Sequence, residues 1–222
     1  MINDNIRYIV FGVLFNHSFK TLDYWGEIVD DILYNNGYFD ASYFTNISSQ
    51  YTLDRELSNA RTGNSLRLTS NQLIYRANVD KNFTTFYDDF CKKIEMYLVP
   101  NILKKYDLII RRLGIVFAEK MTNQELQKFS AKYFKEDISG INDFRFSKKE
   151  TSKQGRLWQG TNDYINKIYT VGTITGLEDF QGVSYDFQFH YNPVQRDVRD
   201  KIKVFLEEGL KNFENDITLG NK

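Results

Sequence analysis

The chain has 222 residues, enough for one large domain or two closely packed small ones with a sizeable apolar core. Its 29 basic and 29 acidic residues cancel, which excludes an overall field that draws the protein to nucleic acid or an anionic membrane. Its one cysteine, Cys91, excludes an internal disulfide and any multi-cysteine metal site, which suits a reducing compartment.

The N-terminal residues bear on the cellular location. Residues 1–10 lack the basic, apolar and small-residue order of a secretory signal, and no stretch approaches the roughly 20 apolar residues that a bilayer span needs. A content of 18 Phe and 15 Tyr against 2 Pro is typical of a packed domain. We therefore expect a cytoplasmic protein with no membrane partner.

The first segment predicts a strand followed by a helix. Residues 6–15 are β-branched, aromatic and apolar on both faces, as in a central strand, and Gly12 within them indicates a bulge or a close backbone approach. From Thr21 the apolar residues follow helical spacing, so Thr21 is the expected N-cap and the Asn-Gly pair at 36–37 the expected end. Residues 38–60 follow neither period and are expected to be mostly irregular, with room for one strand.

A hairpin and a long helix are expected next. Residues 65–79 alternate between apolar and polar side chains around a Ser70-Asn71 turn. Apolar and aromatic residues from Phe83 to Leu98 then keep to one helical face. Pro100 predicts a kink or a stop just before it, because proline cannot donate a backbone hydrogen bond.

The second part of the chain predicts the same kinds of element again. Residues 107–121 predict a strand, and the helix after it opens with a capping box from Thr122 to Glu125. Further strands are expected around 144–146, at 164–175 and at 183–191. Asn192-Pro193 is the expected start of the last helix, whose predicted buried residues are Val194, Val198, Ile202, Phe205, Leu206, Leu210 and Phe213.

This order divides the chain into two halves, 1–105 and 106–222, packed as one globular unit. Residues 11–15 (FGVLF) align with 113–117 (LGIVF), and residues 73–94 align with 187–206. We interpret the alignment as an internal duplication, the alternative being chance similarity between elements built from few residue types. The predicted fold is α+β, with two pseudo-repeated strand-helix-strand-strand-helix halves and a mainly antiparallel sheet covered by helices. A groove between the halves is the default ligand site.

The segment around Arg112, Leu113, Gly114 and Ile115 carries a resemblance. An Arg-aliphatic-Gly-aliphatic strand that follows a hairpin and an amphipathic helix resembles a sporadically distributed family of uncharacterised bacterial proteins. The resemblance implies a bacterial or phage-borne origin and a place among mobile or defence genes. It implies no established reaction and carries over no catalytic residue.

Residue types that perform catalysis are sparse. The two histidines, His17 and His190, lie far apart in the sequence and neither has a local carboxylate cluster, so an enzyme would require them to converge. Cys91 has apolar neighbours and is expected to be a packed, inert thiol. The glycines in 170–182 lack the spacing of a phosphate-binding loop and are expected in turns. We predict no cofactor and no metal.

One segment, residues 145–158, is locally basic and is predicted to be a protruding hairpin or loop. In one interpretation its cations contact phosphates while its tryptophan stacks on a base or anchors a partner. In the other it is a mobile surface loop with the tryptophan tucked underneath. The candidate residues are Arg145, Lys148, Lys149, Lys153, Arg156 and Trp158.

The leading prediction is a non-enzymatic binding or regulatory protein that recognises a protein or small ligand at the seam between the halves. Nucleic-acid binding through residues 145–158 is the second hypothesis, and an enzyme that uses His17 and His190 is the third. The sequence leaves open the identity of the partner or ligand, the pathway and the oligomeric state, and it is compatible with a homo-oligomer.

Overall fold

The computed structural model describes residues 5–35, 44–48, 55–133, 143–151, 156–158, 162–192 and 199–217. Its strands are β1 (Ile6–Phe15), β2 (Phe44–Ser48), β3 (Arg55–Asn59), β4 (Ser65–Leu68), β5 (Gln72–Asn78), β6 (Ile110–Lys120), β7 (Phe144–Glu150), β8 (Tyr164–Ile174) and β9 (Phe180–His190). They form one 9-stranded sheet in the order β2-β3-β4-β5-β1-β6-β9-β8-β7, and every pairing between neighbours is antiparallel.

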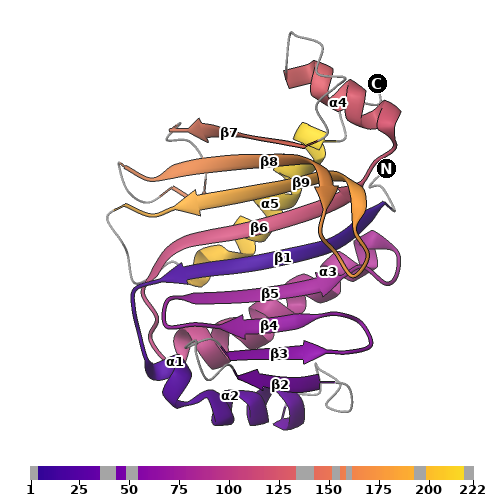
Figure 1. Ribbon diagram of the computed structural model, residues 1–222. Coiled ribbons are helices and arrows are strands. Elements are labelled where there is room, and N and C mark those ends of the chain that lie inside the picture. Colours follow the sequence, from indigo (N-terminus) through magenta and orange to yellow (C-terminus); the bar gives the residue numbers. More distant parts are fainter. Residues whose placement is uncertain are drawn as a thin grey trace.

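The helices lie beside and behind this sheet. They are α1 (Lys20–Asp23), α2 (Trp25–Asp30), η1 (Asp31–Asn35), α3 (Phe83–Lys93), η3 (Ile94–Lys104), α4 (Asn123–Tyr133), η4 (Arg199–Lys201) and α5 (Ile202–Ile217). Helices α3 and α5 run behind the sheet, whereas none of the described helices crosses the centre of the face toward the viewer (Figure 1). The predicted α+β class with a mainly antiparallel sheet is confirmed.

The main core lies between the sheet and these two helices. Side chains alternate between the faces of a strand, and on β1 and β6 the helix-facing set, which includes Phe11 and Phe117, is fully buried. The ring of Phe117 stacks on Phe213 of α5 with 4.6 Å between centroids, and it also contacts Phe83 and Tyr87 of α3. Aromatic side chains bury large apolar areas, so these contacts fix both helices against the centre of the sheet.

The segment between β1 and the hairpin differs from the prediction. Residues 38–60, expected to be mostly irregular with room for one strand, contain two strands, β2 and β3. The only buried aliphatic side chain of β3 is Leu57, so its apolar alternation is too weak to recognise in the sequence. Thr21 is not an N-cap: it is buried, and its Oγ1 donates to the carbonyl oxygen of Thr69 at 3.3 Å, while Phe19 precedes α1. The pair at 36–37 lies outside the described residues.

The helix that starts at Phe83 does not stop before Pro100. From Ile94 it continues as the π-helix η3 through Pro100 to Lys104, and Lys105 N donates to Pro100 O at 3.2 Å, the five-residue spacing of a π-turn. Buried side chains on η3, including Tyr97 and Leu98, explain why the helix continues: its apolar side packs on the core despite the missing donor.

Other predicted elements are confirmed. The 65–79 hairpin forms β4 and β5. The capping box is present, with Thr122 N donating to Glu125 Oε2 at 2.8 Å and Glu125 N donating to Thr122 Oγ1 at 3.3 Å. Of the stripe predicted for the last helix, Ile202, Phe205, Leu206 and Phe213 are buried and Leu210 is half-buried, whereas Pro193, Val194 and Val198 lie outside the described residues.

The two predicted halves contribute separate blocks of the sheet. Residues 1–105 supply β2-β3-β4-β5-β1, and residues 106–222 supply β6-β9-β8-β7. The blocks meet where β1 pairs with β6, and there Gly12 lies directly opposite Gly114. We call this β1–β6 pairing the seam. The internal duplication itself stays a prediction.

Candidate functional site

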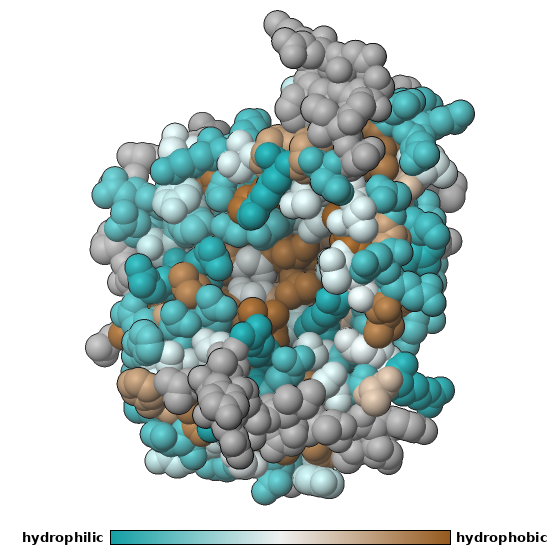
Figure 2. All heavy atoms as spheres, viewed as in Figure 1, coloured by the Kyte–Doolittle hydropathy of each residue, from teal (hydrophilic) through white to brown (hydrophobic). Residues whose placement is uncertain are grey.

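The uncovered face of the sheet is hollowed above the seam. At its centre apolar residues lie in a depression bordered by hydrophilic side chains (Figure 2). The depression is a hollow of about 130 Å³ over Gly12 and Gly114, and we refer to it as the seam hollow. The side chains around the two glycines are those of Val10, Ile74, Arg112, Val116, Asp186 and Gln188.

The two seam glycines leave space that the fold does not need. A Cβ on Gly12 would meet no atom within 4 Å, and one on Gly114 would meet nothing closer than 3.8 Å. Neither glycine has a positive φ, and the β1–β6 register is unbroken between them, so the bulge or close approach predicted at Gly12 is wrong. Glycine within a strand weakens the sheet, so this pair costs stability and leaves an open floor.

At one end of the seam hollow, Val10 packs against side chains of residues 172–182, which we call the β8–β9 arm. Its Ile174 and Phe180 pack with Tyr8 and Ala118 in a small cluster on the uncovered face. The arm curls across the front of the central strands (Figure 1). It pivots where Gly172 pairs with Gly182.

Both glycines at this pivot are required by the backbone. Gly172 has a φ of 125°, which side-chain-bearing residues rarely adopt. A Cβ on Gly182 would lie 2.0 Å from the carbonyl oxygen of Glu119. The sequence predicted turns for the glycines of 170–182, and these two instead bend a hairpin.

The opposite end of the seam hollow is positively charged. Arg112 is paired in register with His190, whose ring stacks on Tyr164 at 4.3 Å between centroids, and Lys149 Nζ lies 4.0 Å from the centre of the Tyr164 ring. Burial, followed by the charges of Arg112 and Lys149, lowers the pKa of His190 to about 4. His190 is therefore neutral near pH 7 and surrounded by cations.

A carboxyl group lies at the side of the seam hollow. Asp186 Oδ1 would be 3.9 Å from a Cβ on Gly114, and Asp186 Oδ2 accepts a 2.6 Å hydrogen bond from Gln188 Nε2. Burial raises the pKa of the Asp186 carboxyl, against the opposing effects of that hydrogen bond and of Arg112. Within the described ranges no carboxylate lies within ion-pair distance of Arg112 or Lys149.

Two candidate residues of the 145–158 segment reach the uncovered face. The segment begins as the edge strand β7, and by register Arg145 lies opposite Thr170 and Lys149 opposite Asn166 on that face. Lys148 alternates to the other face and pairs with Glu150 at 3.2 Å. Because β7 is a strand, these basic residues of the 145–158 segment lie on opposite faces of the sheet and do not form one group.

The other candidates of this segment are placed differently. Arg156 forms an ion pair with Glu207 of α5 at 2.9 Å. Trp158 is half-buried and packs edge-on against Phe189, with 5.2 Å between ring centroids. Lys153 lies outside the described residues.

Asp186 and Gln188 at the border of the seam hollow were not among the candidates from the sequence, and His190 was named there only as a possible catalytic residue, although one signal for this group is present in the sequence. Asp186, Gln188 and His190 alternate with buried aromatics on β9 and therefore share one face. That β9 lies beside the two glycines is a property of the sheet order, which no local pattern contains.

The remaining reactive side chains lie apart from this site. His17 Nε2 is 3.3 Å from Ser70 Oγ beyond the end of β1, whereas His190 Nε2 is 3.1 Å from Gln188 Oε1, so each histidine has its own local partner. Cys91 is half-buried against the core, and burial raises the pKa of its thiol to about 12, which confirms a packed thiol. Over the described ranges no three His, Cys, Asp or Glu side chains are grouped to hold a metal ion.

No protein-family model matches the chain, and no curated protein matches it. Among the described residues, no helix has the length and apolarity that crossing a membrane requires.

Proposed function

We propose that this protein is a non-enzymatic binding protein that holds its ligand in the seam hollow. The observation that carries the proposal is the pair of glycines facing each other on the two central strands, with open space above both. A Cβ would fit at either position, and a residue other than glycine would strengthen the sheet. The open space above the two glycines lowers stability and is not required by the backbone conformation. This combination favours a role in ligand contact.

An internal duplication would explain the position of this site. In each half a central strand (β1 or β6) is followed by further strands, by a strand that pairs with it (β5 or β9), and then by a long helix (α3 or α5). Gly12 and Gly114, aligned by sequence, lie opposite each other as residues on a pseudo-twofold axis do. On this proposal the ligand site lies on that axis.

Binding is favoured over catalysis because the side chains around the seam hollow form no proton-relay pair of the usual kind. Asp186 is engaged by Gln188, and His190 has cations rather than a carboxylate as its charged neighbours. A bacterial or phage origin and a defence role remain what the resemblance at 112–115 implies.

The test compares ligands retained by the wild type and by Gly12→Leu after purification from the native host. A Cβ at position 12 would meet no atom within 4 Å, so we expect a leucine there to extend into the seam hollow, and bound small molecules identified by mass spectrometry should disappear from the variant. Gly26→Leu is the matched control, because Gly26 of α2 is exposed and also has open space around it. Identical bound molecules in all three proteins would contradict the proposal.

A further inference from the structure

The seam hollow is apolar toward one end and cationic at the other. Moving along β1 and β6 toward the arm, its floor is Val10 and Val116, followed by the cluster that contains Ile174 and Phe180. In the other direction the next side chain on β6 is Arg112, with His190 beside it on β9. A ligand lying parallel to the strands therefore meets hydrocarbon at one end and positive charge at the other.

The surrounding face also favours an anion. By register, cations outnumber carboxylates on the described part of the uncovered face between β3 and β7. The cations are Arg67, Arg76, Arg112, Lys120, Arg145 and Lys149, and the carboxylates are Glu56 and Asp186. Arg76 is already engaged, since its guanidinium lies 4.0 Å from the centre of the Tyr8 ring, whereas Arg112 borders the seam hollow itself.

We propose that the ligand of the seam hollow is a small amphipathic anion, with its apolar body over Val10 and Val116 and its carboxylate, sulfonate or phosphate at Arg112. This inference rests on the proposed function and adds the chemical class of the ligand. A guanidinium binds such groups through two parallel hydrogen bonds. Asp186 repels an anion from the middle of the site and so directs the charged group to the Arg112 end.

The neighbours of Arg112 reinforce this orientation. His190 and Lys149 lie on the same side of Arg112, and each of them contacts the ring of Tyr164. The charges on Arg112 and Lys149 disfavour protonation of His190. A bound anion offsets those charges, so the pKa of His190 rises when the site is filled.

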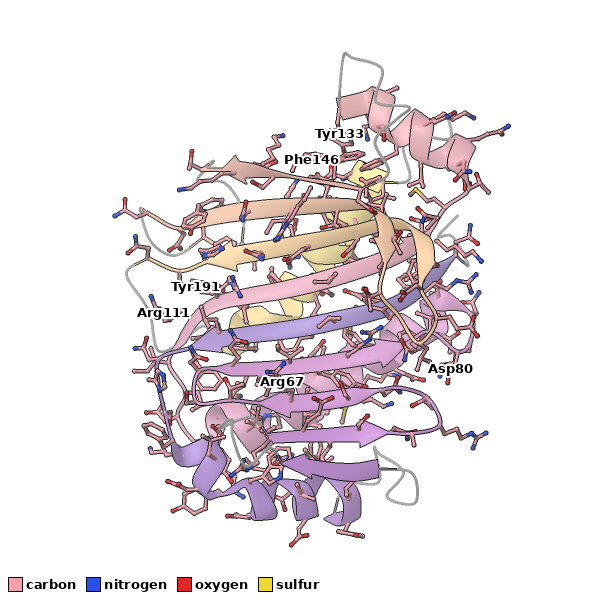
Figure 3. All side chains as sticks on the ribbon, viewed as in Figure 1. Arg67, Asp80, Arg111, Tyr133, Phe146 and Tyr191 are labelled. Atoms are coloured by element: carbon pink, nitrogen blue, oxygen red, sulfur yellow. The ribbon has the colours of Figure 1, made fainter. Side chains whose placement is uncertain are left out.

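The experiment uses two fluorescent probes that differ by one charged group: anilinonaphthalene sulfonate, and N-phenylnaphthylamine, which lacks the sulfonate. Wild-type protein should bind the sulfonate more tightly, and raising the ionic strength should weaken only that probe. Arg112→Gln should weaken sulfonate binding about tenfold, equivalent to the loss of one charged contact, and leave the neutral probe unchanged. The control is Arg111→Gln, one residue away beside Tyr191 (Figure 3), which should alter neither probe.

The outcomes separate the two proposals. Loss of both probes in Gly12→Leu, with an unchanged probe preference in Arg112→Gln, would overturn the anionic ligand and leave the seam hollow as the site. Unchanged binding of both probes in Gly12→Leu would overturn the site itself. Displacement of the sulfonate by single-stranded oligonucleotide, dependent on Arg112, would replace the small anion with a nucleic acid.

Near-UV circular dichroism of each variant shows whether the aromatic core is intact. A second readout does not depend on any variant: the His190 imidazole signals in NMR spectra of wild-type protein should titrate at a higher pH with the sulfonate bound. A pKa of His190 that stays unchanged at saturation would contradict an anion at Arg112.

Discussion

At the residue scale, four glycines in strands fall into two pairs: the backbone requires one pair and does not require the other. Gly172 and Gly182 are required by the backbone, one for its φ of 125° and the other for a carbonyl oxygen 2.0 Å from a hypothetical Cβ. Gly12 and Gly114 have neither constraint. Identical residues in the sequence thus shape an arm in one case and leave an empty floor in the other, and only their surroundings distinguish them.

His190 gives a prediction about pH. Its pKa is about 4 in the folded protein against an ordinary 6.5, so between these values the unfolded chain binds a proton there that the folded chain does not. The contribution of His190 to stability is therefore complete above pH 6.5 and declines as the pH falls toward 4. The free energy of unfolding of wild type, measured with urea, should fall relative to that of His190→Gln as the pH is lowered from 6.5 to 4.

The comparison between these two proteins isolates His190. Asp186, whose pKa is raised, titrates in both and cancels in the difference. Lys149→Gln removes one of the cations that lower the pKa of His190, so the imidazole signals in NMR spectra should titrate at a higher pH in that variant. A difference between wild type and His190→Gln that is constant from pH 6.5 to 4 would show that the imidazole is not held neutral.

The sequence could predict which residues share a face, but not which faces meet. Phe144 and Phe146 alternate with charged residues, and this alternation assigns Arg145 and Lys149 to one side of β7 and Lys148 to the other. The prediction of one basic hairpin or loop at 145–158 did not take this two-residue alternation into account. The pairing of β9 with β6, which brings Asp186 beside Gly114, is a long-range contact without a local signature.

At the element scale, a polar cluster ties the end of α5 to the sheet. Asp216 Oδ2 lies 3.1 Å from Lys167 Nζ and accepts hydrogen bonds from the hydroxyls of Tyr169 at 2.9 Å and Tyr185 at 3.2 Å. Lys167 also pairs with Glu150 of β7 at 3.2 Å. These groups satisfy one another, so the cluster is structural in character rather than a second ligand site.

Helix α4 joins the same cluster. The hydroxyl of Tyr133 donates to the carbonyl oxygen of Asp216 at 3.2 Å, and the ring of Tyr133 lies against Phe146 at 5.1 Å between centroids (Figure 3). The last turn of α5 therefore contacts α4, β8 and β9, and Lys167 of β8 extends the cluster to the edge strand β7. We expect the stability of this part of the sheet to depend on the Asp216 carboxylate.

Asp216→Ala should lower the free energy of unfolding by about 2–4 kcal/mol, because it leaves the buried Lys167 ammonium and two tyrosine hydroxyls without their shared acceptor. Urea unfolding followed by circular dichroism measures the loss. Glu214→Ala removes a carboxylate two residues earlier on α5 and should change stability by about 0.5 kcal/mol or less. Equal losses in the two variants would mean that the cluster contributes no specific stability.

Elements with a regular apolar periodicity or a local capping motif could be predicted from the sequence, and those that depend on tertiary contacts could not. The capping box at Thr122 and the apolar stripe of α5 are local and were recognised. The stop allowed for before Pro100 does not occur, because the burial of η3 outweighs a lost hydrogen bond. The 38–60 segment, expected to hold at most one strand, forms two, because β3 is stabilised by pairing with β4 rather than by its own pattern.

At the scale of the whole molecule, the seam joins the predicted halves through both backbone and core. The β1–β6 pairing runs from Ile6 to Phe15. Phe117 of the second half contacts Phe83 and Tyr87 of the first, and the Tyr87 hydroxyl donates to the carbonyl oxygen of Leu206 at 2.7 Å. Each half alone would expose this apolar surface and a long unpaired strand edge.

We therefore expect residues 1–105 and 106–222, expressed separately, to self-associate, and to form a 1:1 complex when expressed together. Under the proposed duplication, β1 of one fragment would pair with β1 of a second copy as it pairs with β6 in the intact chain, so dimers would be the favoured product. Size-exclusion chromatography with light scattering measures these masses. A full-length chain cleaved after Lys105 is the control and should remain a 1:1 complex, because the contacts across the seam do not need the covalent link. Two monomeric halves that each unfold cooperatively would instead show independent domains, and a ligand site spanning both would then lack its rigid floor.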